Sequence, residues 1–142
     1  MNALDVMRQD HARIKTLFDN ALKNDDRTAR AGLLHQIRTE LMAHDKMKDD
    51  IFYPALRAGG DKAKDVVIEG TVEHHIIEVI LDSLLEVPED TEQWQAKLKV
   101  LKANLEEHIQ NEEDRVFSRA KDALGDATLE ELGRQMEDRR IE

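Results

Sequence analysis

Apolar side chains recur at intervals of three and four residues along almost the whole chain, and runs that alternate at two are nearly absent. Because an α-helix has about 3.6 residues per turn, this spacing places the apolar side chains on one face of each helix. Breaker residues interrupt the pattern at three places, 24–26, 58–61 and 87–91. The sequence therefore predicts four amphipathic helices, expected at about 2–23, 26–57, 62–86 and 90–123.

The short connections between these helices predict their arrangement. Neighbouring helices joined by a few residues run antiparallel, so we expect an all-α fold, an up-down-up-down four-helix bundle over residues 1–124. After Gly125, Thr128 and Glu131 form a capping-box pattern, which marks the start of a helix. We expect a short C-terminal fifth helix within residues 125–142, packed on the bundle.

Composition excludes several classes of function. The 142 residues suffice for one domain with its own core. The net charge of −10 gives a surface that repels phosphate backbones and anionic lipids, so neither nucleic acid nor a membrane is an expected partner. The absence of cysteine excludes disulfides, thiolate metal sites and cysteine nucleophiles. No signal peptide or membrane span is visible, and we expect a cytoplasmic protein.

Each predicted apolar stripe is interrupted by one histidine. A single histidine on such a stripe is usually a structural core residue, but here one occurs in every helix. Counted from the turns, the four lie at similar depths, so their rings can converge on one pocket. Neutral imidazoles bind iron, zinc and copper, and a carboxylate one helical turn from a histidine can join them. The predicted metal ligands are His11, His44, His74, His108 and Glu112.

An internal repeat shows where this ligand set is incomplete. Residues 10–19 match residues 73–82, and residues 41–53 match residues 105–117. In this match Lys48 corresponds to Glu112, so the first half offers an ammonium where the second offers a carboxylate. Two interpretations of Lys48 stay open: its amine reaches solvent past the bundle, or it pairs with Glu112 or a metal-bound anion. Weaker candidates for the missing ligand are Glu40, Asp45 and Glu78, and we expect His35 and His75 to lie outside the site.

The spacing of these residues resembles the hemerythrin-like (HHE cation-binding) domain family. That family carries a His, a His-x-x-x-Glu motif, another His and a second His-x-x-x-Glu motif, and His11, His44, His74 and His108-Ile-Gln-Asn-Glu112 fall on its positions over nearly the whole chain. The resemblance implies one or two non-haem iron ions, used for oxygen binding or sensing, iron handling, or chemistry with peroxide or nitric oxide. Lys48 stands where the first motif has its Glu.

The leading hypothesis is an iron-binding protein that binds or senses oxygen, peroxide or nitric oxide in its core. One alternative is a metal-free or zinc-binding bundle that acts as a regulatory or interaction module, with Lys48 paired to Glu112. Another is a di-iron enzyme that metabolises peroxide or nitric oxide. No recognisable proton donor or electron-transfer partner appears in the sequence, which favours a binding protein over an enzyme.

Overall fold

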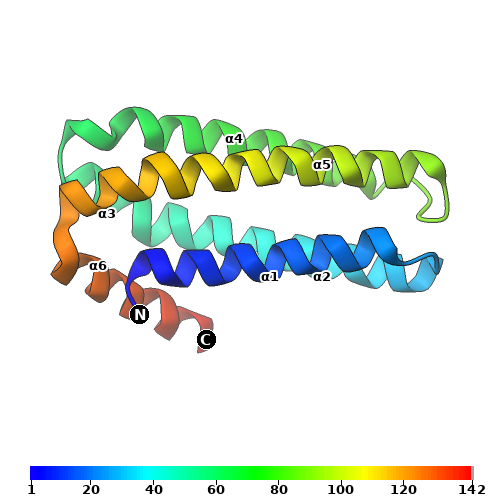
Figure 1. The fold of residues 1–142 in the computed structure, drawn as a ribbon, viewed down its shortest axis with the longest axis horizontal. Coiled ribbons are helices and arrows are strands. Elements are labelled where there is room, and N and C mark those ends of the chain that lie inside the picture. The colour runs from blue at the N-terminus through cyan, green and yellow to red at the C-terminus, as the bar shows by residue number, and fades with distance from the viewer. Residues whose placement is uncertain (142) are drawn as a thin grey trace.

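Four long helices lie side by side along the long axis of the molecule (Figure 1). The computed structural model describes residues 1–141, apart from the side chains of residues 62 and 141, and residue 142 of the predicted C-terminal segment lies outside it. The long helices are α1 (Ala3–Lys23), α2 (Arg27–Met47), α4 (Lys64–Leu84) and α5 (Glu92–Asn111). Over the described residues every element is helical, which confirms the predicted all-α class.

Shorter elements continue two of these helices. The remaining elements are η1 (Lys48–Phe52), α3 (Tyr53–Ala58), η2 (Asp61–Ala63), η3 (Glu112–Val116) and α6 (Phe117–Ile141). The predicted helices 26–57 and 90–123 are thus each interrupted by a π-helical turn, η1 or η3. A π turn inserts one residue into a helix and often marks a functional site. The two turns begin at Lys48 and Glu112, the positions that the internal repeat matches.

Polar side chains begin three of the long helices. Asn2 caps α1 by accepting a hydrogen bond from the backbone N–H of Asp5, at 2.9 Å. Asp26 caps α2 and Thr91 caps α5 in the same way. Such caps satisfy backbone donors that have no partner within the helix. No helix among the described residues combines the length and apolar character needed to cross a membrane.

The C-terminal segment changes direction at Gly125, the boundary after which the sequence predicts a further helix. α6 includes a bend at Gly125, whose φ of 76° and ψ of 170° are not helical, and the chain then returns along α1 (Figure 1). Thr128, the predicted cap, lies inside α6. Gly133 packs so closely on the N-terminus that a Cβ there would lie 2.3 Å from the carbonyl oxygen of Met1. The expected fifth helix is therefore the second part of α6.

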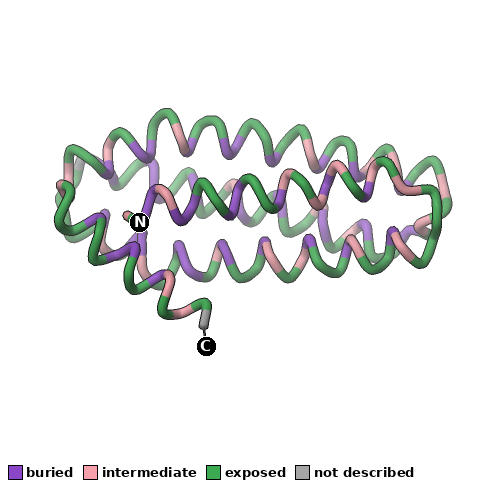
Figure 2. Tube along the Cα trace, turned by 60° about the horizontal axis from the view of Figure 1, so that its bottom comes forward, coloured by how far each residue is buried: buried purple, intermediate pink, exposed green. Residues whose placement is uncertain are grey.

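Buried residues line the inward sides of the helices (Figure 2) and form two apolar clusters. One includes Met7 and Val67, and the other includes Ile14 and Ile77. Along α1 and α4, a buried histidine lies between the two clusters. The buried polar side chains near this level are Asp10, His11, His44, Lys48, His74, His108 and Glu112. We call these seven residues the polar layer.

We expect Gly125→Ala to lower the free energy of unfolding. The backbone at Gly125 lies in a region that only glycine adopts readily, and forcing another residue into it costs about 1–3 kcal/mol. Urea denaturation measures the change. The matched control is Gly32→Ala in α2, where a Cβ likewise meets nothing within 4 Å but the backbone is helical. The control should raise stability by roughly 0.5–1 kcal/mol. An equal change in the free energy of unfolding for the two variants would contradict the non-helical backbone at Gly125.

Candidate metal centre

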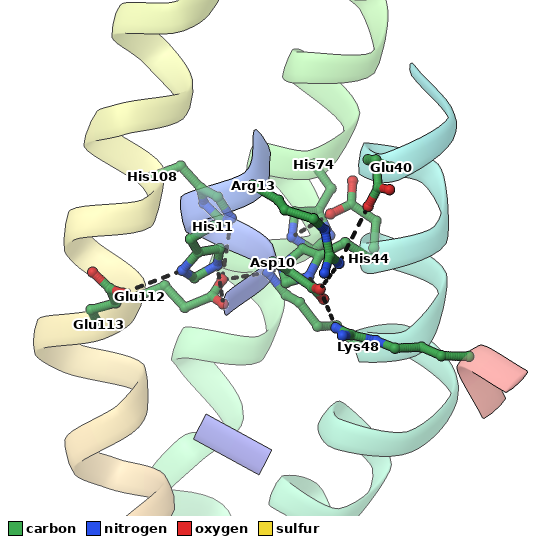
Figure 3. Close-up of polar contacts among 12 residues, drawn as sticks. Asp10, His11, Arg13, Glu40, His44, Lys48, His74, His108, Glu112 and Glu113 are labelled. Carbon is green, nitrogen blue, oxygen red and sulfur yellow. Dashed lines mark hydrogen bonds and ion pairs between the residues drawn. The ribbon is translucent and has the colours of Figure 1, made fainter. Parts of the chain in front are cut away.

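The structure brings all five predicted ligands together in the polar layer (Figure 3). His11 comes from α1, His44 from α2, His74 from α4 and His108 from α5, while Glu112 is the first residue of η3. The rings of His11 and His44 meet edge to face with centroids 5.0 Å apart, and those of His74 and His108 do the same at 5.0 Å. The similar depths inferred from sequence are therefore observed.

Glu112 lies between the two histidine pairs. Its Oε1 is 3.4 Å from Nε2 of His11, and its Oε2 is 3.3 Å from Nε2 of His108. Two sets of three potential ligand atoms result, His11 with His44 and Glu112, and His74 with His108 and Glu112, each with its atoms within 4.8 Å of one another. One carboxylate thus serves two adjacent sets, each with two imidazoles.

Several polar atoms that face the centre of the layer are buried and have no hydrogen-bond partner. They are Nε2 of His11, His44 and His108, both ring nitrogens of His74, and Oε1 of Glu112. Most buried polar atoms in proteins are hydrogen-bonded, and each one that is not costs about 1–3 kcal/mol. A concentration of such atoms in one layer is what a site for a cation requires. These donor atoms therefore fit a metal ion.

Three carboxylates that are not among the five predicted ligands orient three of the imidazoles, and we call them the outer carboxylates. Asp10 lies 2.8 Å from Nδ1 of His44, Glu113 lies 3.4 Å from Nδ1 of His11, and Glu73 bonds to Nδ1 of His108. Such a carboxylate partner keeps the proton on Nδ1 and leaves the Nε2 lone pair free for a metal. The geometry thus prepares these histidines for coordination through Nε2.

These outer carboxylates were missed in the sequence, although a signal was present. Asp10 and Glu73 each precede a site histidine and match each other in the internal repeat. Each, however, contacts the histidine of the next long helix rather than its own neighbour. Asp10 also accepts hydrogen bonds from Arg13 and from Arg140 of α6, so the C-terminal segment reaches the edge of the site.

Lys48 is paired with Glu112. Its side chain is fully buried, and Nζ donates a hydrogen bond to Oε2 of Glu112. This contact excludes the interpretation in which the amine reaches solvent. Burial opposes the charge of Glu112, but the nearby ammonium, His108 and His11 together hold the pKa of Glu112 well below its ordinary value. In the same way, Glu112 and Tyr53 raise the pKa of Lys48 against the effect of burial. Both groups are charged.

The histidines are not electrostatically alike. Burial lowers the pKa of His44 to about 4 despite its bond to Asp10, and burial together with Lys48 lowers the pKa of His74 to about 2. Both are neutral at pH 7, the form in which imidazole binds metals. Burial acts in the same direction on His108, but the Glu112 and Glu73 carboxylates outweigh it and raise its pKa.

An aromatic ring stacks on one histidine of each pair. Phe117 stacks on His11 with centroids 6.3 Å apart, and Tyr53, its counterpart in the repeat, stacks on His74 at 5.9 Å. Gly70 makes room for the tyrosine hydroxyl, since a Cβ there would lie 2.5 Å from it. A cavity of about 20 Å³, enough for one water-sized molecule, lies beside Tyr53, Gly70 and Glu112.

The weaker candidates lie at the margin of the layer or outside it. Asp45 is 3.5 Å from Nε2 of His74, and burial raises its pKa to about 6. Glu40 instead pairs with Arg13 at 3.4 Å, and Glu78 is exposed. His35 and His75 are exposed as well, as expected from the helical period.

Known proteins resemble this chain in sequence and in fold. Uncharacterized protein Rv2633c of Mycobacterium tuberculosis is 33% identical over 141 residues, which span 96% of this chain and 83% of the relative. Mb2666c of Mycobacterium bovis gives the same values. The crystal structure of the Rv2633c homolog from Mycobacterium kansasii, a hemerythrin HHE cation binding domain-containing protein, superposes with a TM-score of 0.87 at 29% identity, covering 98% of this chain and 85% of that one. The family model of the hemerythrin HHE cation binding domain matches residues 2–120, and the chain belongs to this family.

Proposed function

We propose that this protein binds iron in the polar layer and uses the site to bind or sense a small molecule, namely oxygen, peroxide or nitric oxide. The observation that carries the proposal is the group of buried histidine nitrogens and the Glu112 oxygen that lack hydrogen-bond partners. A cation shared among these atoms removes the cost of burying them.

The donor set favours iron. Two histidines and one carboxylate, with the other coordination positions open, are the ligands typical of non-haem iron(II) sites. Both candidate sets have this composition because Glu112 belongs to each. When bound, iron supplies an open coordination position for a diatomic molecule or peroxide. The apolar clusters above and below the layer exclude bulk water from it.

Lys48 favours one metal over two. It occupies Oε2 of Glu112, on the side of His108, whereas Oε1, on the side of His11, has no hydrogen-bond partner. The set of His11, His44 and Glu112 is therefore the better first position. A second cation at the other set would lie close to the ammonium, and like charges at that distance repel strongly in a buried site.

The ion pair also supports a second candidate function. Lys48 and Glu112 neutralise each other without any metal. A helical protein stabilised in this way could serve as a metal-free interaction module. The two functions differ in whether the purified protein contains iron.

Metal content decides between them. We expect protein produced in iron-rich medium and analysed by elemental mass spectrometry to contain iron, and the His44→Ala variant to lose most of it. The control His35→Ala changes an exposed histidine and should keep the wild-type iron content.

A wild-type protein without metal would support the metal-free module, and stoichiometric zinc would support a zinc site. Peroxide consumption no faster than that of free iron would favour binding over catalysis.

We expect Lys48→Glu to increase the iron content from about one to about two ions per chain. The new carboxylate completes the first His-x-x-x-Glu motif, His44 to position 48, and removes the repelling charge. The matched control is Lys46→Glu, because Lys46 is exposed and lies outside the layer. An unchanged ratio of iron to protein would show that Lys48 does not limit metal binding.

We expect Lys48→Met to destabilise the metal-free protein by about 3 kcal/mol, because the Glu112 carboxylate would stay buried without its partner. Urea denaturation with a chelator measures this change. Added iron should reduce the loss, since a metal ion can replace the ammonium. Lys46→Met is the control: Lys46 lies 3.6 Å from Asp50 on the surface, and such pairs contribute only about 0.5 kcal/mol. Similar losses for both variants would contradict the role of the buried pair.

A further inference from the structure

The outward face of α4 carries a stripe of exposed apolar side chains. Ile68, Val72, Ile76 and Val79 are 50%, 55%, 49% and 54% exposed. The opposite face of the same helix is buried in the core. A surface helix normally has a polar outer face, and a helix that is apolar all round is usually covered on both sides. Contiguous exposed apolar residues of this kind mark interaction surfaces.

The internal repeat provides a comparison within the same chain. When the match of residues 10–19 to residues 73–82 is continued along both helices at the same offset, the counterparts of the stripe residues on α1 are, in the same order, Asp5, Gln9, Arg13 and Thr16. All four are polar, although α1 and α4 both contribute a histidine to the layer. The fold and the site therefore do not require apolar residues on the outer face. In Figure 1, α4 lies at the edge of the molecule, on the far side from the second part of α6.

We infer that the α4 stripe, residues 68, 72, 76 and 79, is a dimer interface that pairs with the α4 stripe of a second copy in antiparallel orientation. A two-fold axis uses the same patch on both subunits, so the patch must complement itself. With the axis near the middle of the stripe, Ile68 lies opposite Val79 of the second copy and Val72 lies opposite Ile76. Each larger side chain then meets a smaller one.

Beside the N-terminal half of the stripe, basic and acidic groups are balanced. Lys64 is exposed there, and Arg115 and Arg119 extend from the neighbouring segment toward α4. Arg115 pairs with Glu69 at 3.0 Å, and Arg119 pairs with Asp65 at 2.5 Å. With Asp61, which is exposed just before α4, this end has three cations and three carboxylates.

The C-terminal half has an excess of acidic groups. Glu78 and Asp82 are exposed beside it, and Arg38 pairs with Asp82 at 2.7 Å. A parallel pair would place the two acidic ends together, whereas an antiparallel pair places each acidic end against the end that carries Lys64, Arg115 and Arg119, which favours the antiparallel orientation. The helix dipoles of the two α4 helices are also antiparallel in this arrangement.

Analytical ultracentrifugation of the full chain tests the inference. We expect a concentration-dependent dimer of the 16.3 kDa chain, and we expect Ile68→Glu/Val79→Glu to weaken dimerisation by about 100-fold or more. The control Val100→Glu changes a 55% exposed valine on α5, outside the stripe, and should leave dimerisation unchanged. A wild-type monomer throughout the micromolar range would overturn the inference and leave the stripe to a different protein.

Disulfide cross-linking tests the orientation with milder substitutions. The chain has no cysteine, so introduced pairs are unambiguous. A mixture of Ile68→Cys and Val79→Cys proteins should form the mixed disulfide dimer on oxidation. Ile68→Cys alone should not, because antiparallel pairing separates its two copies by about 16 Å along the helix, beyond disulfide reach. Efficient cross-linking of Ile68→Cys alone would overturn the antiparallel arrangement.

Discussion

The ion pair between Lys48 and Glu112 is the contact on which the polar layer depends. Both groups are charged and fully enclosed between two apolar clusters, where an unpaired charge is very costly. Pairing holds Glu112 in the centre, within 3.4 Å of Nε2 of His11 and 3.3 Å of Nε2 of His108. Lys48 bonds to Oε2 of Glu112 and leaves Oε1, beside His11, without a hydrogen-bond partner. In the proposed function a metal ion would therefore bind Oε1 while Lys48 keeps Oε2.

The outer carboxylates connect the layer to the rest of the fold. Asp10 links α1 to His44 of α2, and Glu73 links α4 to His108 of α5, so each hairpin is tied at the level of the site. Arg140 binds Asp10 from the second part of α6. Orientation of the imidazoles thus depends on contacts from three separate parts of the chain.

The helices and the candidate ligands were largely predictable, whereas several local features were not. The three-four spacing located the four long helices, and the histidines on their stripes were those that the structure brings together. The π turns at Lys48 and Glu112 had no sequence signal, since one inserted residue barely changes the spacing. The backbone is non-helical at Gly125, where the sequence predicts a boundary, whereas Thr128, the predicted cap, lies within helical residues.

The sequence by itself determined the helical class, the family resemblance and the identity of the histidines and Glu112 at the centre. These depend on periodicity and residue type, which are local properties. Only the tertiary structure decided between the two interpretations of Lys48, and only it assigned Asp10 and Glu73 to histidines on neighbouring helices. The physical reason is that the energy of a buried charge depends on its surroundings. For Lys48 these are set by a carboxylate 64 positions away, which becomes its neighbour only when the helices pack.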